Sequence, residues 1–329
     1  MDRSRLKAVV TNWVQPEVLE LLSGRCTVEA NREREPWPPS EVLARTRDAD
    51  ALLCFMTDRI DEAFLAQCPR LRIVACALKG ADNFDIEACR RRGVTVTIVP
   101  DLLTEPTAEL AVGLMIALAR HIRHGDAHVR SGTFTGWRPT LYGRGLSGSK
   151  VGILGLGAVG QALARRLHAF GAALAYFDER PLSDSAERAL GVVRRDRESV
   201  IGDSDFLMLA LPLTPRTLHL IDAAQIRRMK PGTFLVNPAR GSLVDEEAVT
   251  DALESGHLAG YAADVFEMED WARGDRPRRI APRLLRHPAT VLTPHLGSAV
   301  EAVRREIALS AARDIIACLT GGRPPNAIN

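Results

Sequence analysis

The sequence predicts an α/β fold made of two doubly wound parallel-sheet domains. Short apolar runs with the length of buried strands alternate with helical patterns along nearly the whole chain, and this alternation is typical of parallel sheets. A glycine-rich turn between one such strand and a helix, at residues 155–160, is the second observation. The length of 329 residues, with 46% apolar and 26% charged residues, is typical of a globular protein with about two domains.

The first predicted domain comprises residues 1–100 together with 298–329. Helical patterns separate its strand candidates, and the proline-rich segment 32–39 is predicted to be a loop. The long amphipathic helix predicted at 300–319 is expected to return to this domain. The strand candidates are 7–10, 51–55, 72–77 and 94–99.

The second predicted domain comprises residues 101–297. It begins with a nearly all-apolar helix at 107–119, which we expect to be buried or to lie at an interface. The loop at 134–145 carries Trp137 and Tyr142, which fit interface anchors or pocket walls, and equally fit aromatics that only hold the loop in place. We expect a homodimer formed through this helix and loop. The strand candidates are 151–154, 174–177, 205–211, 233–237, 258–263 and 289–293.

The glycine-rich turn predicts a dinucleotide-binding site. Gly155 permits the tight turn, Gly157 lets the backbone approach a pyrophosphate, and Gly160 allows the strand and the helix to pack closely. The N-terminus of the following helix offers free N–H groups to the phosphates. About twenty residues further on, the next strand ends in Asp178 and Glu179, where an acidic side chain would bind the ribose hydroxyls. The alternative is a structural turn followed by a coincidental acid.

These acidic residues predict NAD rather than NADP as the cofactor. A 2′-phosphate would face the carboxylates of Asp178 and Glu179 together, and like charges repel. Arg180 opposes this expectation, because an arginine in that turn can bind a 2′-phosphate.

Residues with catalytic chemistry follow the last three strand candidates. Arg240, Glu269 and His295, here called the trio, each lie a few residues after the end of a strand. Because ligands of open α/β sheets bind outside the carboxyl ends of the strands, we expect the trio in one crevice. Arginine would bind an oxyanion through paired N–H donors, and a carboxylate would fix the tautomer of a histidine that acts as acid or base. Each residue alone also fits an ordinary surface side chain.

Charge and composition argue against several other classes of function. The formal net charge of +2, with arginines scattered along the chain, does not indicate nucleic-acid binding. The sequence has no signal-peptide core and no run of membrane-spanning length, so we expect no membrane and the cytoplasm as the compartment. Six cysteines without a C-x-x-C pair favour reduced, mostly buried thiols. His121, His124 and His128 have helical spacing without a completing ligand, so we expect a solvated or interfacial helix face and no metal.

Four motifs, in this order, resemble the D-2-hydroxyacid dehydrogenase family over nearly the whole chain. They are GLGAVG at 155–160, NPARGS at 237–242, DVFEME at 264–269 and TPHLG at 293–297. The resemblance implies a Rossmann NAD-binding domain inserted into a flavodoxin-like substrate domain, with the trio as catalytic residues. The cofactor-binding residues that it implies are Gly155, Leu156, Gly157, Ala158, Val159, Gly160, Asp178, Glu179, Thr107, Pro212, Ala239, Asp264, His295 and Gly297.

Three segments within that family resemblance are similar to the phosphite dehydrogenases, namely 77–85, 99–104 and 261–273. Most of the family has proline after the acidic motif and a small neutral residue before the substrate-loop glycine, whereas this chain has Asp270-Trp271 and Lys79-Gly80 there. An added ammonium suits phosphite, largely a dianion at neutral pH, because two unit charges about 4 Å apart interact by about 4 kcal/mol at an effective dielectric of 20. We therefore expect NAD-dependent oxidation of phosphite to phosphate, with hydride transfer from phosphorus to nicotinamide C4. The implied substrate-binding residues are Lys79, Gly80, Met56, Leu103, Trp137, Tyr142, Pro294 and Ser298.

Two alternatives stay open on the sequence. A D-2-hydroxyacid dehydrogenase that reduces glyoxylate, hydroxypyruvate or a similar keto acid needs the same trio but does not need Lys79. A non-catalytic, NAD-sensing interaction protein is the other alternative, since the family includes transcriptional co-repressors. The complete trio argues against it.

Overall fold

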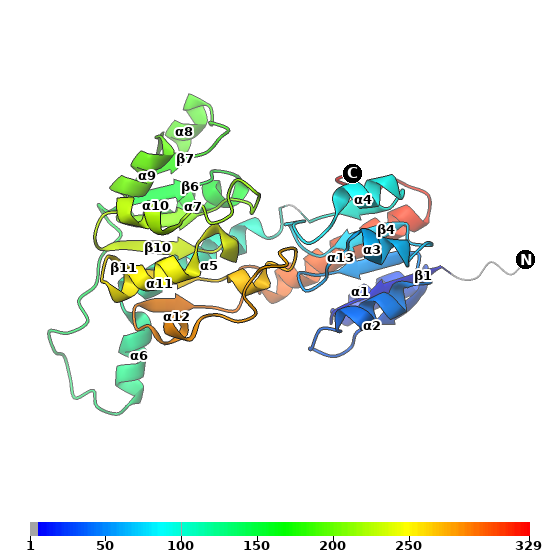
Figure 1. Ribbon diagram of the computed structural model, residues 1–329, viewed down its shortest axis with the longest axis horizontal. Coiled ribbons are helices and arrows are strands. Elements are labelled where there is room, and N and C mark those ends of the chain that lie inside the picture. Colours follow the sequence, from blue (N-terminus) through cyan, green and yellow to red (C-terminus); the bar gives the residue numbers. More distant parts are fainter. Residues whose placement is uncertain (1–5, 100) are drawn as a thin grey trace, which may run out of the picture. The chain divides into compact units, whose positions relative to one another are not determined.

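The structure is a computed structural model that describes residues 6–99 and 101–329; residues 1–5 and 100 of the first predicted domain lie outside it. The chain divides into two compact units, and each has its own parallel sheet (Figure 1). Unit 1 contains the described residues up to Leu103, Trp271–Asp275 and Ser298–Asn329, and unit 2 contains Thr104–Asp270 and Arg276–Gly297. The predicted fold class, two doubly wound parallel-sheet domains, is confirmed.

The sheet of unit 1 has five strands within the described residues, all parallel, in the order β2-β1-β3-β4-β5. Its central strands are fully buried aliphatic runs, as expected for a sheet that is covered on both faces. The strands are β1 (Lys7–Val10), β2 (Thr27–Ala30), β3 (Ala51–Cys54), β4 (Ile73–Cys76) and β5 (Thr95–Thr97).

Helices cover both faces of this sheet. Leu53 packs with α1 and α13 on one face, and Leu52, the preceding residue, packs with α2, α3 and α4 on the other. Asp61 and Asp85 cap α3 and α4, because each carboxylate accepts a backbone N–H from three residues further on. The helices are α1 (Pro16–Ser23), α2 (Pro39–Thr46), α3 (Glu62–Ala66), α4 (Ile86–Arg91) and α13 (Glu301–Leu319).

The sheet of unit 2 has seven strands within the described residues, in the order β12-β11-β10-β9-β6-β7-β8, and its pairs are parallel. The strand order reverses at β6, whose neighbours are β7 and β9, and ligands of such sheets bind at this point. The strands are β6 (Lys150–Leu154), β7 (Ala173–Phe177), β8 (Val192–Arg194), β9 (Phe206–Leu209), β10 (Thr233–Asn237), β11 (Leu258–Ala263) and β12 (Thr290–Leu292).

Two hydrophobic cores also lie on the two faces of this sheet. Ile153 belongs to the core built with α5 and α7, and Leu154 to the core built with α9, α10, α11 and α12. Two 3₁₀ turns, η1 (Gly241–Leu243) and η2 (Glu267–Glu269), follow β10 and β11. The helices are α5 (Thr104–Ala119), α6 (Ile122–Arg130), α7 (Ala158–Ala169), α8 (Asp184–Leu190), α9 (Arg197–Asp203), α10 (Ala223–Arg228), α11 (Glu246–Glu254) and α12 (Pro282–Arg286).

The structure differs from the sequence-based expectation mainly at the edges of the sheets. The edge strands β2 and β8 were not predicted, because their residues are mostly not buried and form no apolar run. The apolar helix α5 is largely buried, but it begins at Thr104 rather than at residue 107. No helix among the described residues is long and apolar enough to cross a membrane.

The segment after α5 projects from unit 2. Figure 1 shows α6 and the long loop that follows it extending away from the sheet. Large apolar side chains are exposed along this segment, at Ile122, Val129, Phe134, Trp137 and Tyr142. Trp137 and Tyr142 are 77% and 75% exposed.

Candidate active site

The trio lies after three neighbouring strands of unit 2. Arg240 follows β10, Glu269 belongs to η2 after β11, and His295 follows β12. These strands are adjacent and parallel, so the three loops leave the sheet at the same edge. The positions of the strand ends therefore explain why these three residues, far apart in the sequence, lie at the same edge of the sheet.

Glu269 and His295 form a hydrogen-bonded pair. His295 Nδ1 lies 2.7 Å from Glu269 Oε2, and Glu269 Oε1 accepts the Phe266 N–H at 2.8 Å. With Nδ1 donating to the carboxylate, the other ring nitrogen, Nε2, is left to exchange a proton with a ligand. The pair thus has the geometry of an acid/base histidine with its orienting carboxylate.

Asp264 organises the loop that carries His295. It is buried, and its carboxylate accepts hydrogen bonds from Thr293 Oγ1 at 2.5 Å, Leu296 N–H at 2.7 Å and Gly297 N–H at 2.8 Å. Burial raises the pKa of Asp264, whereas these hydrogen bonds favour its charged form. His295 itself has a left-handed backbone with φ 57°, which the bonded loop maintains. Asp264 therefore supports the acid/base residue through the loop backbone.

Asn237, at the end of β10, shapes the loop that carries Arg240. Its buried side chain donates to the Arg240 carbonyl at 2.8 Å and accepts the Ala239 N–H at 3.1 Å. Arg240 Nη1 donates to the Ala239 carbonyl at 2.8 Å. The next residue, Gly241, lies against the segment that leads to Glu269, because a Cβ there would come within 1.9 Å of the Phe266 carbonyl carbon. The structure therefore brings the loops of Arg240 and Glu269 into contact.

The glycine turn after β6 fits a dinucleotide. Gly155 has φ 90°, and a Cβ there would come within 2.5 Å of the Ala210 carbonyl oxygen, so only glycine fits. A Cβ on Gly160 would meet the Gly155 carbonyl oxygen at 2.2 Å, whereas nothing lies within 4 Å of a Cβ on Gly157. Gly157 also precedes α7, whose N-terminus has no side-chain cap. Tight packing on one side and open backbone N–H groups on the other are what a pyrophosphate requires.

Asp178 lies beside this turn, at the end of β7. Its Oδ2 accepts the Leu156 N–H at 2.7 Å and its Oδ1 accepts the Arg180 N–H at 2.8 Å, which fixes the orientation of the carboxylate. Glu179 instead pairs with Arg216 at 3.2 Å, and both side chains are exposed. Asp178 is therefore the better placed of the two acids for a ribose.

The other predicted cofactor residues also belong to unit 2. Thr107 donates to the Gly297 carbonyl at 3.4 Å, and so joins α5 to the His295 loop. Pro212 and Ala239 lie in the loops after β9 and β10, at the same edge of the sheet.

The predicted substrate residues are divided between the two units. Lys79, Gly80, Met56, Leu103 and Ser298 belong to unit 1, and Pro294, Trp137 and Tyr142 belong to unit 2. Pro294 precedes His295, whereas Trp137 and Tyr142 lie on the exposed loop after α6. Within unit 2, no described contact places these two aromatics beside the trio.

Unit 1 has a cavity at the carboxyl ends of β1 and β3. Its volume is about 660 Å³, and Trp13, Phe55, Met56 and Arg304 are among the residues that line it. Arg304 Nη1 lies 3.4 Å from both Ser298 Oγ and the Ala77 carbonyl oxygen, and burial lowers the pKa of its guanidinium. This sheet also reverses its strand order between β1 and β3, the position where ligands bind in such folds.

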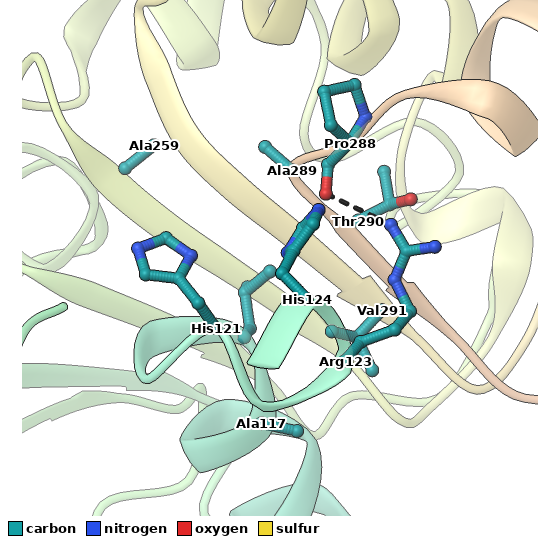
Figure 2. A pocket seen from close by; sticks show the side chains of 10 residues that line it. Ala117, His121, Arg123, His124, Ala259, Pro288, Ala289, Thr290 and Val291 are labelled. Atoms are coloured by element: carbon teal, nitrogen blue, oxygen red, sulfur yellow. Dashed lines mark hydrogen bonds between the residues drawn. The ribbon is translucent and has the colours of Figure 1, made fainter. Parts of the chain in front are cut away.

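The histidines after α5 line a different and much smaller void. Figure 2 shows His121, Arg123 and His124 beside the segment from Pro288 to Val291, with Arg123 donating to the Pro288 carbonyl at 3.1 Å. The void is about 10 Å³, about the size of one water molecule. None of the trio lines it, and among the described residues no group of three potential ligands could hold a metal.

Comparison with known proteins identifies the family. Residues 112–297 match the model "D-isomer specific 2-hydroxyacid dehydrogenase, NAD binding domain", in agreement with the predicted cofactor, NAD. The glyoxylate reductase of Pyrococcus furiosus is 38% identical over 98% of this chain and 95% of its own length, and that of Aeropyrum pernix is 40% identical over 99% and 96%.

Solved structures agree with this match over the whole chain. The TT0316 protein of Thermus thermophilus has a TM-score of 0.89 at 35% identity, and covers 98% of this chain and 100% of its own. An NADPH-dependent glyoxylate/hydroxypyruvate reductase of Sinorhizobium meliloti, solved with NADP and malonate, has a TM-score of 0.85 at 29% identity and covers 99% and 97%.

The expectation of phosphite oxidation is wrong. The similar curated proteins named above are glyoxylate reductases, and these findings favour the keto-acid alternative. The argument from Lys79 also weakens in the structure, because Asp101 lies close enough to stabilise the charged ammonium while burial lowers its pKa. The charge of Lys79 alone therefore does not indicate a dianionic substrate. The motifs around the trio, the glycine turn and the match over residues 112–297 show that the chain belongs to the D-isomer specific 2-hydroxyacid dehydrogenase family.

Proposed function

We propose that this protein reduces glyoxylate, hydroxypyruvate or a similar small 2-keto acid to the 2-hydroxy acid, with NADH as reductant. The observation that carries the proposal is the 2.7 Å Glu269–His295 pair, on the same sheet edge as Arg240 and in the unit that holds the dinucleotide turn. The names of the similar proteins support the substrate class.

The residues of the trio would have separate tasks. The nicotinamide, when bound, supplies the hydride that adds to the carbonyl carbon. His295 Nε2 donates a proton to the carbonyl oxygen as negative charge develops there, and Glu269 holds the ring in the required tautomer. Arg240 binds the substrate carboxylate through its planar N–H donors, and so places the carbonyl near His295.

One assay tests the proposal. NADH absorbance is followed with glyoxylate and with hydroxypyruvate, and the protein is expected to oxidise NADH with at least one of them. Protein that binds NADH but turns over neither keto acid would contradict the proposal and favour a non-catalytic, NAD-sensing protein.

We also propose that the protein acts as a homodimer. The support is the exposed apolar surface on α6 and the following loop, which includes Val129, Phe134, Trp137 and Tyr142. Sedimentation or light scattering is expected to give twice the chain mass of 35.9 kDa. A monomer at micromolar concentration would contradict this assignment.

A further inference from the structure

Two buried glutamates join the loop of Arg240 to the loop of Glu269. The Glu267 N–H donates to Glu246 Oε1 at 2.7 Å, and the Glu246 N–H donates to Glu267 Oε1 at 3.2 Å. The two residues are only 4% and 7% exposed. Each carboxyl group thus accepts the backbone N–H of the other residue, so both of these amides have a hydrogen-bond partner.

The backbones of the two loops are in direct contact beside these bonds. A Cβ on Gly241 would also come within 2.2 Å of the Glu267 nitrogen, so the chain after Arg240 has no freedom to move toward η2. The Ser242 N–H donates to Asp270 Oδ2 at 2.8 Å and closes the other end of the contact. A change in the position of one loop is therefore transmitted to the other.

A third segment joins the same contact through His219. Its Nε2 lies 2.8 Å from Glu267 Oε2, and its backbone N–H donates to the Ser242 carbonyl at 2.8 Å. His219 has a left-handed backbone, with φ 47°, which is uncommon for a residue other than glycine. Both oxygens of Glu267 are thereby engaged, one with Glu246 and one with His219.

The contact leads directly to two members of the trio. Phe266, next to Glu267, donates the N–H that holds Glu269 Oε1 at 2.8 Å. Arg240 immediately precedes Gly241, the glycine that lies against Phe266. Nothing else described in unit 2 links the two loops by reciprocal bonds of this kind.

We propose that Glu246 and Glu267 are positioning residues that set the arrangement of Arg240 relative to Glu269 and its partner His295. The proposal rests on the proposed function insofar as it takes the trio as catalytic. The glutamates themselves touch neither substrate nor cofactor in this account, and act only through the loop backbones.

Glu246, Glu267 and His219 form a cluster whose charge depends on pH. Burial raises the pKa of Glu246 to about 7, and the nearby carboxylates of Glu267, Asp270 and Glu269 add to the effect. His219 and the buried phenol of Tyr261, on β11, also face the cluster, and Arg276 Nε donates to the Met268 carbonyl of η2 at 3.0 Å. Glu246 therefore carries a proton below about pH 7, and above it the cluster gains a negative charge that repels its neighbours.

The experiment compares Glu246→Ala, Glu246→Gln and the matched control Glu247→Ala. Glu247 is the next residue on α11, and its exposed side chain pairs with Arg283. Glu246→Ala leaves the Glu267 N–H without its acceptor, so we expect kcat for glyoxylate to fall about tenfold while the KM for NADH stays within about twofold. Glu246→Gln keeps an acceptor oxygen and is expected to recover kcat to within about threefold.

The pH profile separates positioning from a general loss of stability. Between about pH 6 and about pH 9, kcat of Glu246→Gln should decline less than kcat of the wild type, because glutamine cannot ionise. A kcat of Glu246→Ala equal to that of Glu247→Ala, or a Glu246→Gln variant no better than Glu246→Ala, would overturn the proposal.

Hydrogen exchange tests the same contact without turnover. Amides of residues 266–270 should exchange faster in Glu246→Ala than in Glu247→Ala, and equal rates would overturn the proposal. If the wild type reduces no keto acid, the proposed function fails, and this comparison still decides whether Glu246 holds the two loops.

Discussion

The carboxyl ends of the two parallel sheets carry different chemistry. In unit 2 the loop after β11 holds two carboxylates, Asp264 and Glu269, that accept backbone N–H groups, and Glu269 also bonds to His295 in the loop after β12. In unit 1 the loops after β3 and β4 carry Met56 and Lys79, and a cavity of about 660 Å³ lies beside Arg304. The carboxyl ends of the strands thus carry acid/base residues in unit 2, and a lysine and a cavity in unit 1.

The two units also differ in how many hydrogen bonds hold these side chains in place. Asp264 and Glu269, both in the loop after β11, each accept hydrogen bonds from backbone N–H groups, and Glu269 bonds to His295, so the histidine is held in place before a ligand arrives. Such preorganisation is what proton transfer needs. Cations and apolar walls in unit 1 instead suit the recognition of a small anion. The comparison leads us to expect that loss of His295 in unit 2 lowers kcat, and that loss of Lys79 in unit 1 raises the KM for the keto acid.

The largest expected effect is that of His295→Asn. Loss of the proton donor should lower kcat for glyoxylate by about 10³-fold, since general acid catalysis contributes 10²–10⁴-fold. Steady-state kinetics measure this, with binding of NADH followed by its fluorescence as a check on folding. The control His168→Asn changes an exposed histidine and should leave kcat within about twofold. A His295→Asn enzyme with wild-type kcat would contradict the role of His295 as the proton donor.

Asp178→Ala should have the next largest effect. The variant loses a carboxylate that is oriented by two backbone N–H groups, so kcat/KM for NADH should fall about 30-fold, the value of a hydrogen bond to a charged group. The preference for NADH over NADPH should shrink at the same time, because the repulsion of a 2′-phosphate is removed. Asp184→Ala, at an exposed acidic residue of α8 in the same unit, is the control. A wild type that prefers NADPH would contradict the assignment of Asp178.

Lys79→Met tests the recognition side of the comparison. Removal of this half-buried cation should raise the KM for glyoxylate about tenfold and leave kcat within about threefold. Lys150→Met, at an exposed lysine of unit 2, should change neither constant. If Lys79→Met lowered kcat and left KM unchanged, the assignment of Lys79 to substrate recognition would be wrong.

The smallest expected effect is on the pH dependence of stability. Glu246 has a folded-state pKa of about 7 against an ordinary value of 4.5, so its contribution to stability is complete below 4.5 and is lost as the pH rises through 7. Relative to Glu246→Gln, the wild type should lose on the order of 2 kcal/mol between pH 5 and pH 8. Urea unfolding at the two pH values measures the difference, and a difference that does not change with pH would contradict the burial of this carboxyl.

The sequence predicted the interior of both sheets better than their edges. Buried strands such as β3 and β9 are continuous apolar runs, which identify them directly. The edge strands β2 and β8 bury little, so hydrogen bonding rather than composition defines them. The parallel arrangement of the strands followed from their alternation with helices, whereas their order within each sheet was not predicted.

For the candidate site, the position of each residue in the fold was easier to predict than its hydrogen-bond partners. Arg240, Glu269 and His295 stand out because each follows a buried strand. Glu246 and His219 were not predicted, because Glu246 bonds to the backbone N–H of Glu267 and His219 bonds to the Glu267 side chain, and no spacing in the sequence encodes such contacts. The substrate was misassigned because the sequence displays the charge of Lys79 but neither its burial, which lowers its pKa, nor the proximity of Asp101, which raises it.

The central claim is tested most directly by following the hydride itself. The wild type is incubated with glyoxylate and NADH that carries deuterium at both positions of nicotinamide C4, and the product is examined by mass spectrometry and NMR. The account predicts glycolate with deuterium bound to its C2 carbon, formed in step with the loss of NADH and about 10³-fold more slowly by His295→Asn. Glycolate without deuterium, or no glycolate at all, would contradict it.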